Sequence, residues 1–244
     1  MAGVILAVCG LGVACGAWAQ SKPKGPAIPA GSYATERGWG TLEITGAGPQ
    51  QFRLVTAGGE AQACLMKGEL TGRTAKLPTL SGGKPCALRF TRVGQGASSG
   101  FKLEETSKNN VCREFCGPDA QFAGQYYRVT NACQPASIQK EQDRAKVQIE
   151  NKAFIAARDR LRPLLRDCQK TLDPWTEAKL RNDLAATHFR IGDFRQCRDT
   201  LAPLNEYADQ SDANIRRRYP QAEAELIIEI ITLTRILREQ CPAN

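Results

Sequence analysis

Apolar and polar residues alternate along the first half of the chain, in short runs separated by turn residues. Gly40–Thr45 and Gln51–Thr56 alternate in this way, and Cys86–Val93 is the strongest run. Because the side chains of a β-strand point alternately to opposite faces, such runs predict half-buried strands. About six strands at this spacing predict a small antiparallel β-barrel or β-sandwich. We place this domain at residues 32–133.

The second half of the chain, residues 134–244, has helical periodicity and few glycines. Residues 157–164 match residues 197–204 at a fixed offset of 40, and Phe154 matches Phe194 at the same offset. A period near 40 predicts stacked helical hairpins. A third long helix, at Gln221–Glu239, is expected to cap the stack. The predicted fold class is therefore α+β, with a barrel or sandwich followed by an all-α helical-hairpin domain.

The second copy of the repeat has a glycine-containing turn between two helices whose core positions are leucine or small. The turn is Gly192-Asp193-Phe194, and the core positions are Leu180, Leu184, Ala185, Cys197, Leu201 and Leu204. This arrangement resembles a tetratricopeptide repeat, which implies a stack with a concave groove. The chain departs from that family in its period of 40. It also carries Pro163 and Pro203 in the second helices, where each is expected to kink or end its helix.

A second resemblance lies in the first half of the chain. Cys112–Gly117 is followed by Phe122, Gly124 and Tyr126 at alternate positions. The segment resembles small exported proteobacterial β-domains of the lysozyme-inhibitor-like type. This resemblance implies an inhibitor or immunity-type protein that blocks a cell-wall hydrolase. Residues 20–133 hold 14 Lys and Arg against 8 Asp and Glu, so a strongly basic target would be repelled.

The first 19 residues carry no charged side chain and predict a signal peptide. Val4–Ala17 is apolar apart from glycines, and Ala17-Trp18-Ala19 fits a cleavage site before Gln20. Residues 20–31 are rich in Pro, Gly and Lys and predict a flexible leader. A lipoprotein anchored at Cys15 is the alternative, which the absence of the usual leucine makes less favourable. We expect a periplasmic or secreted protein without a transmembrane segment.

Eight cysteines remain after the signal peptide, and an even set in an exported chain predicts disulfides. Antiparallel helices bring the ends of a hairpin together, which predicts Cys133–Cys168 and Cys197–Cys241. The cysteines that then remain for the β-domain are Cys64, Cys86, Cys112 and Cys116. We expect Cys64–Cys86 and Cys112–Cys116, although four cysteines allow three pairings. With one histidine in the chain and no pair of CxxC knuckles, no metal site is expected.

The sequence contains no pattern that indicates catalysis. His188 is the only histidine and lies beside Phe189 in a predicted helix, where packing is its expected role. GxSxG, P-loop and Asp-rich calcium motifs do not occur in the chain. The formal charge of +8 includes only one short basic run, Arg216–Arg218, so nucleic acid is not an expected partner. We expect no enzyme activity, catalytic residue or cofactor, with an enzyme of unrecognised type as an alternative.

Binding is therefore the expected function, with a protein or peptide of the cell envelope as the partner. An anionic glycan is a further alternative, because the mature protein is basic. The first helices of a hairpin stack line its concave face. On the helical domain the candidate binding residues are Lys179, Asn182, Asp183, Thr187 and Arg190, and on the β-domain they are Trp39, Tyr126 and Tyr127.

Overall fold

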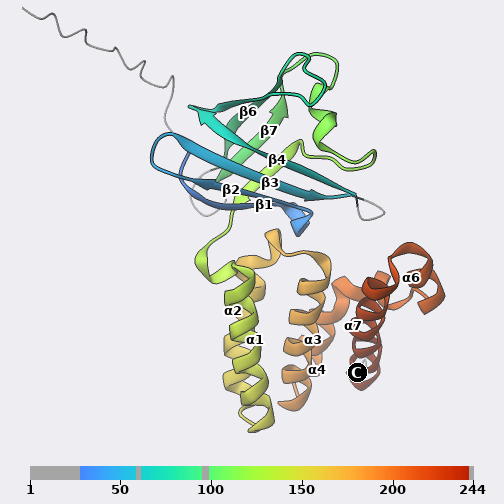
Figure 1. Cartoon of the computed structure of the whole chain (residues 1–244). Coiled ribbons are helices and arrows are strands. Elements are labelled where there is room, and N and C mark those ends of the chain that lie inside the picture. Colours follow the sequence, from blue (N-terminus) through green and yellow to red (C-terminus); the bar gives the residue numbers. More distant parts are fainter. Residues whose placement is uncertain (1–27, 59–61, 95–98, 242–244) are drawn as a thin grey trace, which may run out of the picture.

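The computed structural model describes residues 28–58, 62–94 and 99–241 and contains a β-barrel followed by a helical region (Figure 1). The expected signal peptide and residues 20–27 of the expected leader lie outside the described residues. The strands are β1 (Gly31–Thr35), β2 (Gly40–Thr45), β3 (Gln50–Ala57), β4 (Ala63–Thr71), β5 (Thr74–Leu77), β6 (Cys86–Val93), β7 (Gly100–Glu105) and β8 (Gly124–Arg128).

The eight strands form one closed antiparallel barrel in sequence order. Each strand pairs with its neighbours in the chain, and β1 also pairs with β8, which closes the sheet. Alternate residues point inward, as the burial of Leu42 and Ile44 on β2 shows, with the side chains between them exposed. The interior is filled by apolar side chains such as Leu54, Phe90 and Leu103. The expected alternation is confirmed, and the barrel is the architecture that it produces.

The barrel begins earlier in the chain than the sequence predicts. Ile28, in the expected leader, is buried, and the side-chain amide of Gln50 bonds to both its backbone N–H and its carbonyl. Gly31, the last residue of that leader, starts β1. The prediction of a flexible leader through residue 31 is therefore wrong at Ile28 and Gly31, because both residues are part of the barrel.

Two disulfides fasten a short 3-10 helix, η4 (Val111–Phe115), to the barrel wall. They are Cys64–Cys116 and Cys86–Cys112, so the expected pairs Cys64–Cys86 and Cys112–Cys116 are wrong. The reason is topological, because β5 lies between β4 and β6 and separates Cys64 from Cys86. Cys112, near the start of η4, is therefore bonded to β6, and Cys116, directly after η4, is bonded to β4.

The helical region contains two antiparallel hairpins, α1–α2 and α3–α4, followed by shorter helices and a long last helix, α7. Disulfides Cys133–Cys168 and Cys197–Cys241 are present as predicted. No helix of the described ranges is long and apolar enough to cross a lipid bilayer. The helices are α1 (Pro135–Glu150), α2 (Phe154–Cys168), α3 (Pro174–Arg190), α4 (Phe194–Leu201), α5 (Asn205–Ala208), α6 (Asp212–Arg218) and α7 (Gln221–Gln240).

The two hairpins share one turn geometry, at the offset of 40 found in the sequence. Lys152 has φ of +60° in the first turn, and Gly192 has φ of +79° in the second. In each turn the next residue, Ala153 or Asp193, donates its backbone N–H to a carbonyl five positions earlier. This pattern of a left-handed residue and a six-to-one hydrogen bond is a Schellman C-cap. Lysine occupies the first left-handed position at a steric cost that glycine avoids in the second.

The two prolines of the repeat have different effects on their helices. α2 continues through Pro163 to Cys168, so this proline does not end its helix, which leaves a kink as the other expected effect. α4 does end, at Leu201, and Pro203 lies in the following 3-10 turn, η7 (Ala202–Leu204). Proline lacks the backbone N–H that an α-helix interior requires.

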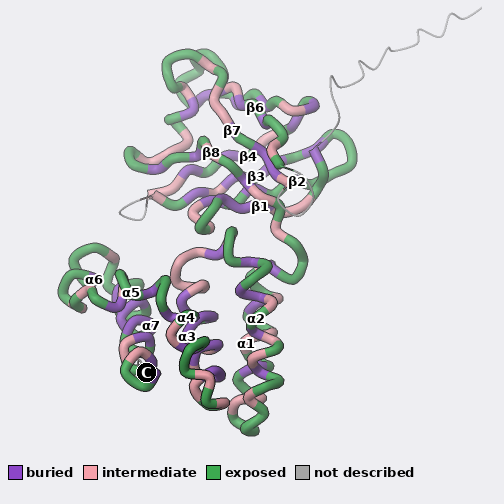
Figure 2. Tube along the Cα trace, turned by 180° about the vertical axis from the view of Figure 1, so that it is seen from behind, coloured by how far each residue is buried: buried purple, intermediate pink, exposed green. Residues whose placement is uncertain are grey.

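The barrel and the helical region have separate cores, and they meet at a narrow joint (Figure 2). The short turn η1 (Glu36–Gly38), after β1, packs on η6 (Gln169–Thr171), after α2. Gly38 has φ of +63°, and a Cβ atom at this position would lie 2.6 Å from the backbone nitrogen of Asp173. The joint therefore requires a residue with no side chain at position 38.

Two side-chain contacts accompany this close approach. The Arg37 guanidinium donates a 2.6 Å hydrogen bond to the hydroxyl of Tyr207. The Lys170 ammonium lies 3.5 Å from the centre of the Tyr127 ring, which is a cation–π distance. Tyr127, expected as a partner contact, therefore packs within the molecule between barrel and helices.

Gly38→Ala is expected to destabilise the protein and loosen the joint, because its Cβ would meet the backbone of Asp173. Gly82→Ala is the matched control, since Gly82 has φ of +69° and open space around it. Both variants lose about 1–2 kcal/mol from the left-handed backbone, and Gly38→Ala loses about 1–3 kcal/mol more from the clash. Urea unfolding measures the free energy of unfolding of both variants. Small-angle X-ray scattering should show a larger radius of gyration for Gly38→Ala and not for Gly82→Ala. If the two variants have equal stability and equal radii of gyration, position 38 does not need to be glycine for the barrel to pack on the helical region.

Candidate binding groove of the helical region

A groove runs between α1 and α7, with α3 at its base. α3 packs against both of the other helices. The groove has a volume of about 770 Å³, in the range of ligand sites in proteins. It is lined by Gln139, Gln142, Asp143, Lys146 and Ile149 of α1, by Lys179, Asn182, Asp183 and Ala186 of α3, and by Leu226, Glu229, Ile230, Thr232, Leu233 and Ile236 of α7.

The α7 side of the groove carries an exposed apolar stripe, with Glu229 and Thr232 beside it. Leu226, Leu233 and Ile236 have 43%, 42% and 45% of their surface accessible to solvent. They recur at spacings of seven and three, so they form one stripe on the helix. The opposite stripe of α7 packs on α3, α5 and α6 through buried residues that include Ile227 and Ile231. Large apolar side chains that stay exposed together on a folded helix mark a surface for contact with another molecule.

The α1 and α3 sides of the groove are polar. The side-chain amide of Gln142 donates a 3.1 Å hydrogen bond to Asp183, and the amide of Gln139 donates a 2.8 Å bond to Asp143. Burial raises the pKa of the Asp183 carboxyl above its usual range, while the bond from Gln142 and the charges of Lys146 and Lys179 act to lower it. No ion pair within 4 Å involves Asp183 in the described part of the chain. A partly desolvated carboxylate therefore lies at the base of the groove.

A buried polar network holds α7 against α3. The side-chain amide of Asn182 donates to the carbonyl of Ile230 at 2.9 Å, and the hydroxyl of Thr234 donates to Asn182 Oδ1 at 2.9 Å. Asn182 and Thr234 have almost no exposed surface. Buried polar groups that satisfy one another fix the relative position of the elements that carry them. The network thus sets how far the α7 wall stands from α3.

Asn182→Ala is expected to lower the free energy of unfolding by about 1–3 kcal/mol, because two buried hydrogen bonds between α3 and α7 are lost and the Thr234 hydroxyl keeps only the Ile230 carbonyl. Lys179→Ala on the same helix is the control. Its side chain is exposed, so a change within about 0.5 kcal/mol is expected. Chemical denaturation measures both variants, and equal stability would contradict the role of the network.

The structure brings together only part of the candidate binding face predicted on α3. Lys179 and Asp183 line the groove. Asn182 reaches its base, but its amide is committed to α7. Thr187 is buried and its hydroxyl donates to the carbonyl of Leu184, so it does not form part of an accessible face. Arg190 is exposed and lies beyond the residues that line the groove.

The aromatic candidates on the barrel form no common surface with the groove. Tyr126 is fully buried and its hydroxyl donates to the carbonyl of Phe122, so its prediction as a contact residue is wrong. Trp39 is half-buried and packs on Tyr126, with ring centres 6.3 Å apart. These side chains pack the barrel because the alternation of β8 turns Tyr126 inward.

The α7 stripe is the feature of the groove that the sequence did not predict. The prediction of a cap helix at Gln221–Glu239 does not distinguish the faces of that helix. Large apolar residues occur around more of α7 than one buried stripe needs, and Leu226, Leu233 and Ile236 are the surplus. This excess is the signal that could have indicated a contact surface.

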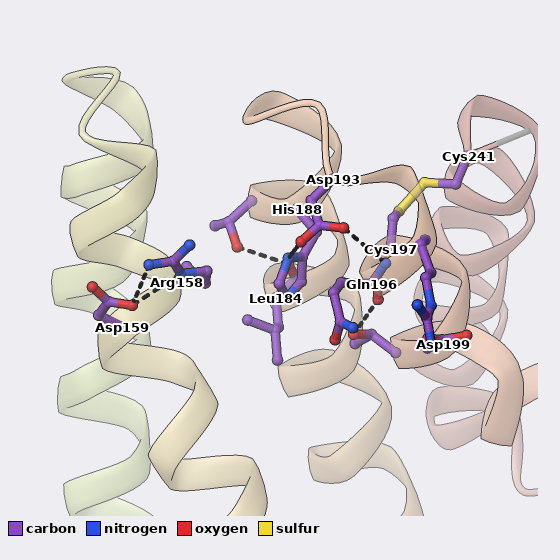
Figure 3. Close-up of polar contacts among 12 residues, drawn as sticks. Arg158, Asp159, Leu184, His188, Asp193, Gln196, Cys197, Asp199 and Cys241 are labelled. Carbon is purple, nitrogen blue, oxygen red and sulfur yellow. Dashed lines mark hydrogen bonds and ion pairs between the residues drawn. A yellow bond between two sulfur atoms is a disulfide. The ribbon is translucent and has the colours of Figure 1, made fainter.

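His188 lies on α3 and points toward the start of α4 (Figure 3). Its Nδ1 atom is buried without a hydrogen-bond partner, 3.7 Å from a carboxylate oxygen of Asp193. Asp193 also caps α4 by accepting a hydrogen bond from the backbone N–H of Gln196. Burial lowers the pKa of His188 below its usual 6.5, Asp193 acts to raise it, and Arg158 and Arg162 act to lower it. His188 is buried and packs within the helical region, which is the role that the sequence predicted.

Acidification is expected to destabilise the protein through His188. Its folded pKa is below the unfolded value of 6.5, so the unfolded chain binds the proton first and stability falls as the pH drops below about 6.5. His188→Asn removes this titration. The free energy of urea unfolding, measured from pH 7.5 to pH 5, should therefore fall more steeply for the unmodified protein than for His188→Asn. Identical slopes for the two proteins would show that the buried imidazole makes no contribution to the pH dependence of stability.

No protein-family model, curated protein or solved structure matches the chain. The described ranges also contain no group of three or more His, Cys, Asp or Glu placed to hold a metal ion.

Proposed function

We propose that this chain is an exported protein of the bacterial cell envelope that works by binding a segment of another protein in the groove between α1, α3 and α7. The observation that carries the proposal is the stripe of exposed Leu226, Leu233 and Ile236 along a groove of about 770 Å³. The groove has polar groups on its other side, which supply specificity once apolar contacts supply affinity.

Export is supported by the first 19 residues of the sequence and by the four disulfides. Disulfides persist in oxidising compartments such as the periplasm and the extracellular medium, and four are compatible with either. We propose cleavage after Ala19, which releases the mature protein into one of these compartments.

We also propose that the helical region is a tetratricopeptide-like stack. Its two hairpins repeat the same turn at an offset of 40, and the groove is lined by the first helix of each hairpin, α1 and α3. Stacks of this kind present such a concave face to their ligands. α7 takes the place of the first helix of a third hairpin and supplies the apolar wall.

A displayed library of random 20-residue peptides, selected against purified residues 20–244, tests the proposal. Binders are expected that lose at least tenfold in affinity on Leu233→Asp, because a charge then lies on the apolar wall. Ile155→Asp is the matched control, since Ile155 is 59% exposed on α2 and does not line the groove. Fluorescence anisotropy measures the affinities. If every binder is unaffected by Leu233→Asp, the groove is not the binding site.

A further inference from the structure

The groove runs parallel to the helices that form it. Its lining residues recur at spacings of three and four on each helix, from Gln139 to Ile149 on α1 and from Leu226 to Ile236 on α7. Residues at these spacings follow one face of a helix along its axis. At 1.5 Å per residue, ten residues extend about 15 Å, or about three helical turns. The space therefore has the length and direction of a short fourth helix beside α1, α3 and α7.

The hydrogen-bonding groups that line the groove favour a helical ligand over an extended one. An extended peptide must find partners for its own backbone N–H and C=O groups. Along the α7 wall the side chains of Leu226, Leu233 and Ile236 have no such groups, and Glu229 and Thr232 are the α7 lining residues that can provide a side-chain partner. At the base, the amide of Asn182 is already bonded to α7. A helix satisfies most of its backbone internally, so it covers this wall with fewer unpaired backbone groups than an extended peptide.

The charges of the groove specify the polar side of that helix. Asp143, Asp183 and Glu229 line it with Lys146 and Lys179, and Asp183 lies deepest among the carboxylates, with a single hydrogen bond from the neutral Gln142. Lys146 and Lys179 influence Asp183 through charge but form no ion pair with it among the described residues. A cation brought by a ligand can therefore contact a carboxylate that is partly shielded from water, where charge-assisted hydrogen bonds are strongest.

We propose that the groove accepts an amphipathic α-helix of a partner protein, with its apolar stripe on Leu226, Leu233 and Ile236 and a Lys or Arg side chain at Asp183. This inference rests on the proposed function, because it names the ligand class of the same groove. The two contacts lie on adjacent sides of the groove, so the ligand carries its basic residue next to the apolar stripe.

Two displayed libraries of 18-residue peptides with equal composition test the helical ligand. One places its apolar residues at positions i, i+3 and i+7, and the other places them at every second position. We expect binders that depend on Leu233 and not on Ile155 from the first library alone, and circular dichroism of the bound mixtures should show added helix. Groove-dependent binders from the second library alone would overturn the helical ligand and leave the proposed function intact. No groove-dependent binder from either library would overturn both.

The basic residue is tested on the selected helical peptides by a double-mutant cycle. Replacing the Lys or Arg of the peptide by Gln is expected to weaken its binding to the unmodified protein about tenfold. The same replacement should have little effect on binding to the Asp183→Asn variant. Asp143→Asn is the control, because Asp143 is exposed at the rim and bonded to Gln139. Equal effects of the Gln replacement on all three proteins, or selected peptides without Lys and Arg, would overturn the contact with Asp183.

Discussion

The close approach of Gly38 to the backbone around Asp173 is the contact on which the arrangement of the whole molecule depends. The barrel and the helices have separate cores, so little apolar burial joins them. The segment that receives Gly38 directly follows Cys168, whose disulfide to Cys133 holds both ends of the first hairpin. This disulfide, the glycine and the Arg37–Tyr207 and Lys170–Tyr127 contacts together define how the barrel sits on the helical region. Through these contacts the groove of the helical region acquires a fixed orientation to the barrel.

Both walls of the groove pack on α3, which contributes to two separate apolar cores. Leu180 and Leu184 of α3 share a core with α1 and α2, whereas Ala178 and Ala185 share one with α4 and α7. The Asn182 network ties α3 to α7, and the Cys197–Cys241 disulfide ties α4 to the end of α7. A groove with rigid walls binds with less loss of conformational freedom than one that must assemble around its ligand.

The parts of the structure that the sequence predicted are those that depend on local geometry. The two helical disulfides follow from the antiparallel course of a hairpin, and the strands follow from alternation. The barrel disulfides depend on which strands are neighbours, and the separation of β4 from β6 by β5 cannot be read from the spacing of Cys64 and Cys86. The sequence does not predict β1, because its five residues include a glycine and follow a Pro-rich segment. The exposed stripe of α7 required knowing which face α3 covers.

Closure of the barrel decides how the first domain can meet other molecules. Every described strand has a partner on both sides, since β1 and β8 pair with each other. An open sheet offers an edge to which an extended peptide, or a second chain, can add a strand. This barrel offers none among its described strands, so it is protected from edge-to-edge association. Any partner of the barrel must contact its loops or the outward side chains of its wall.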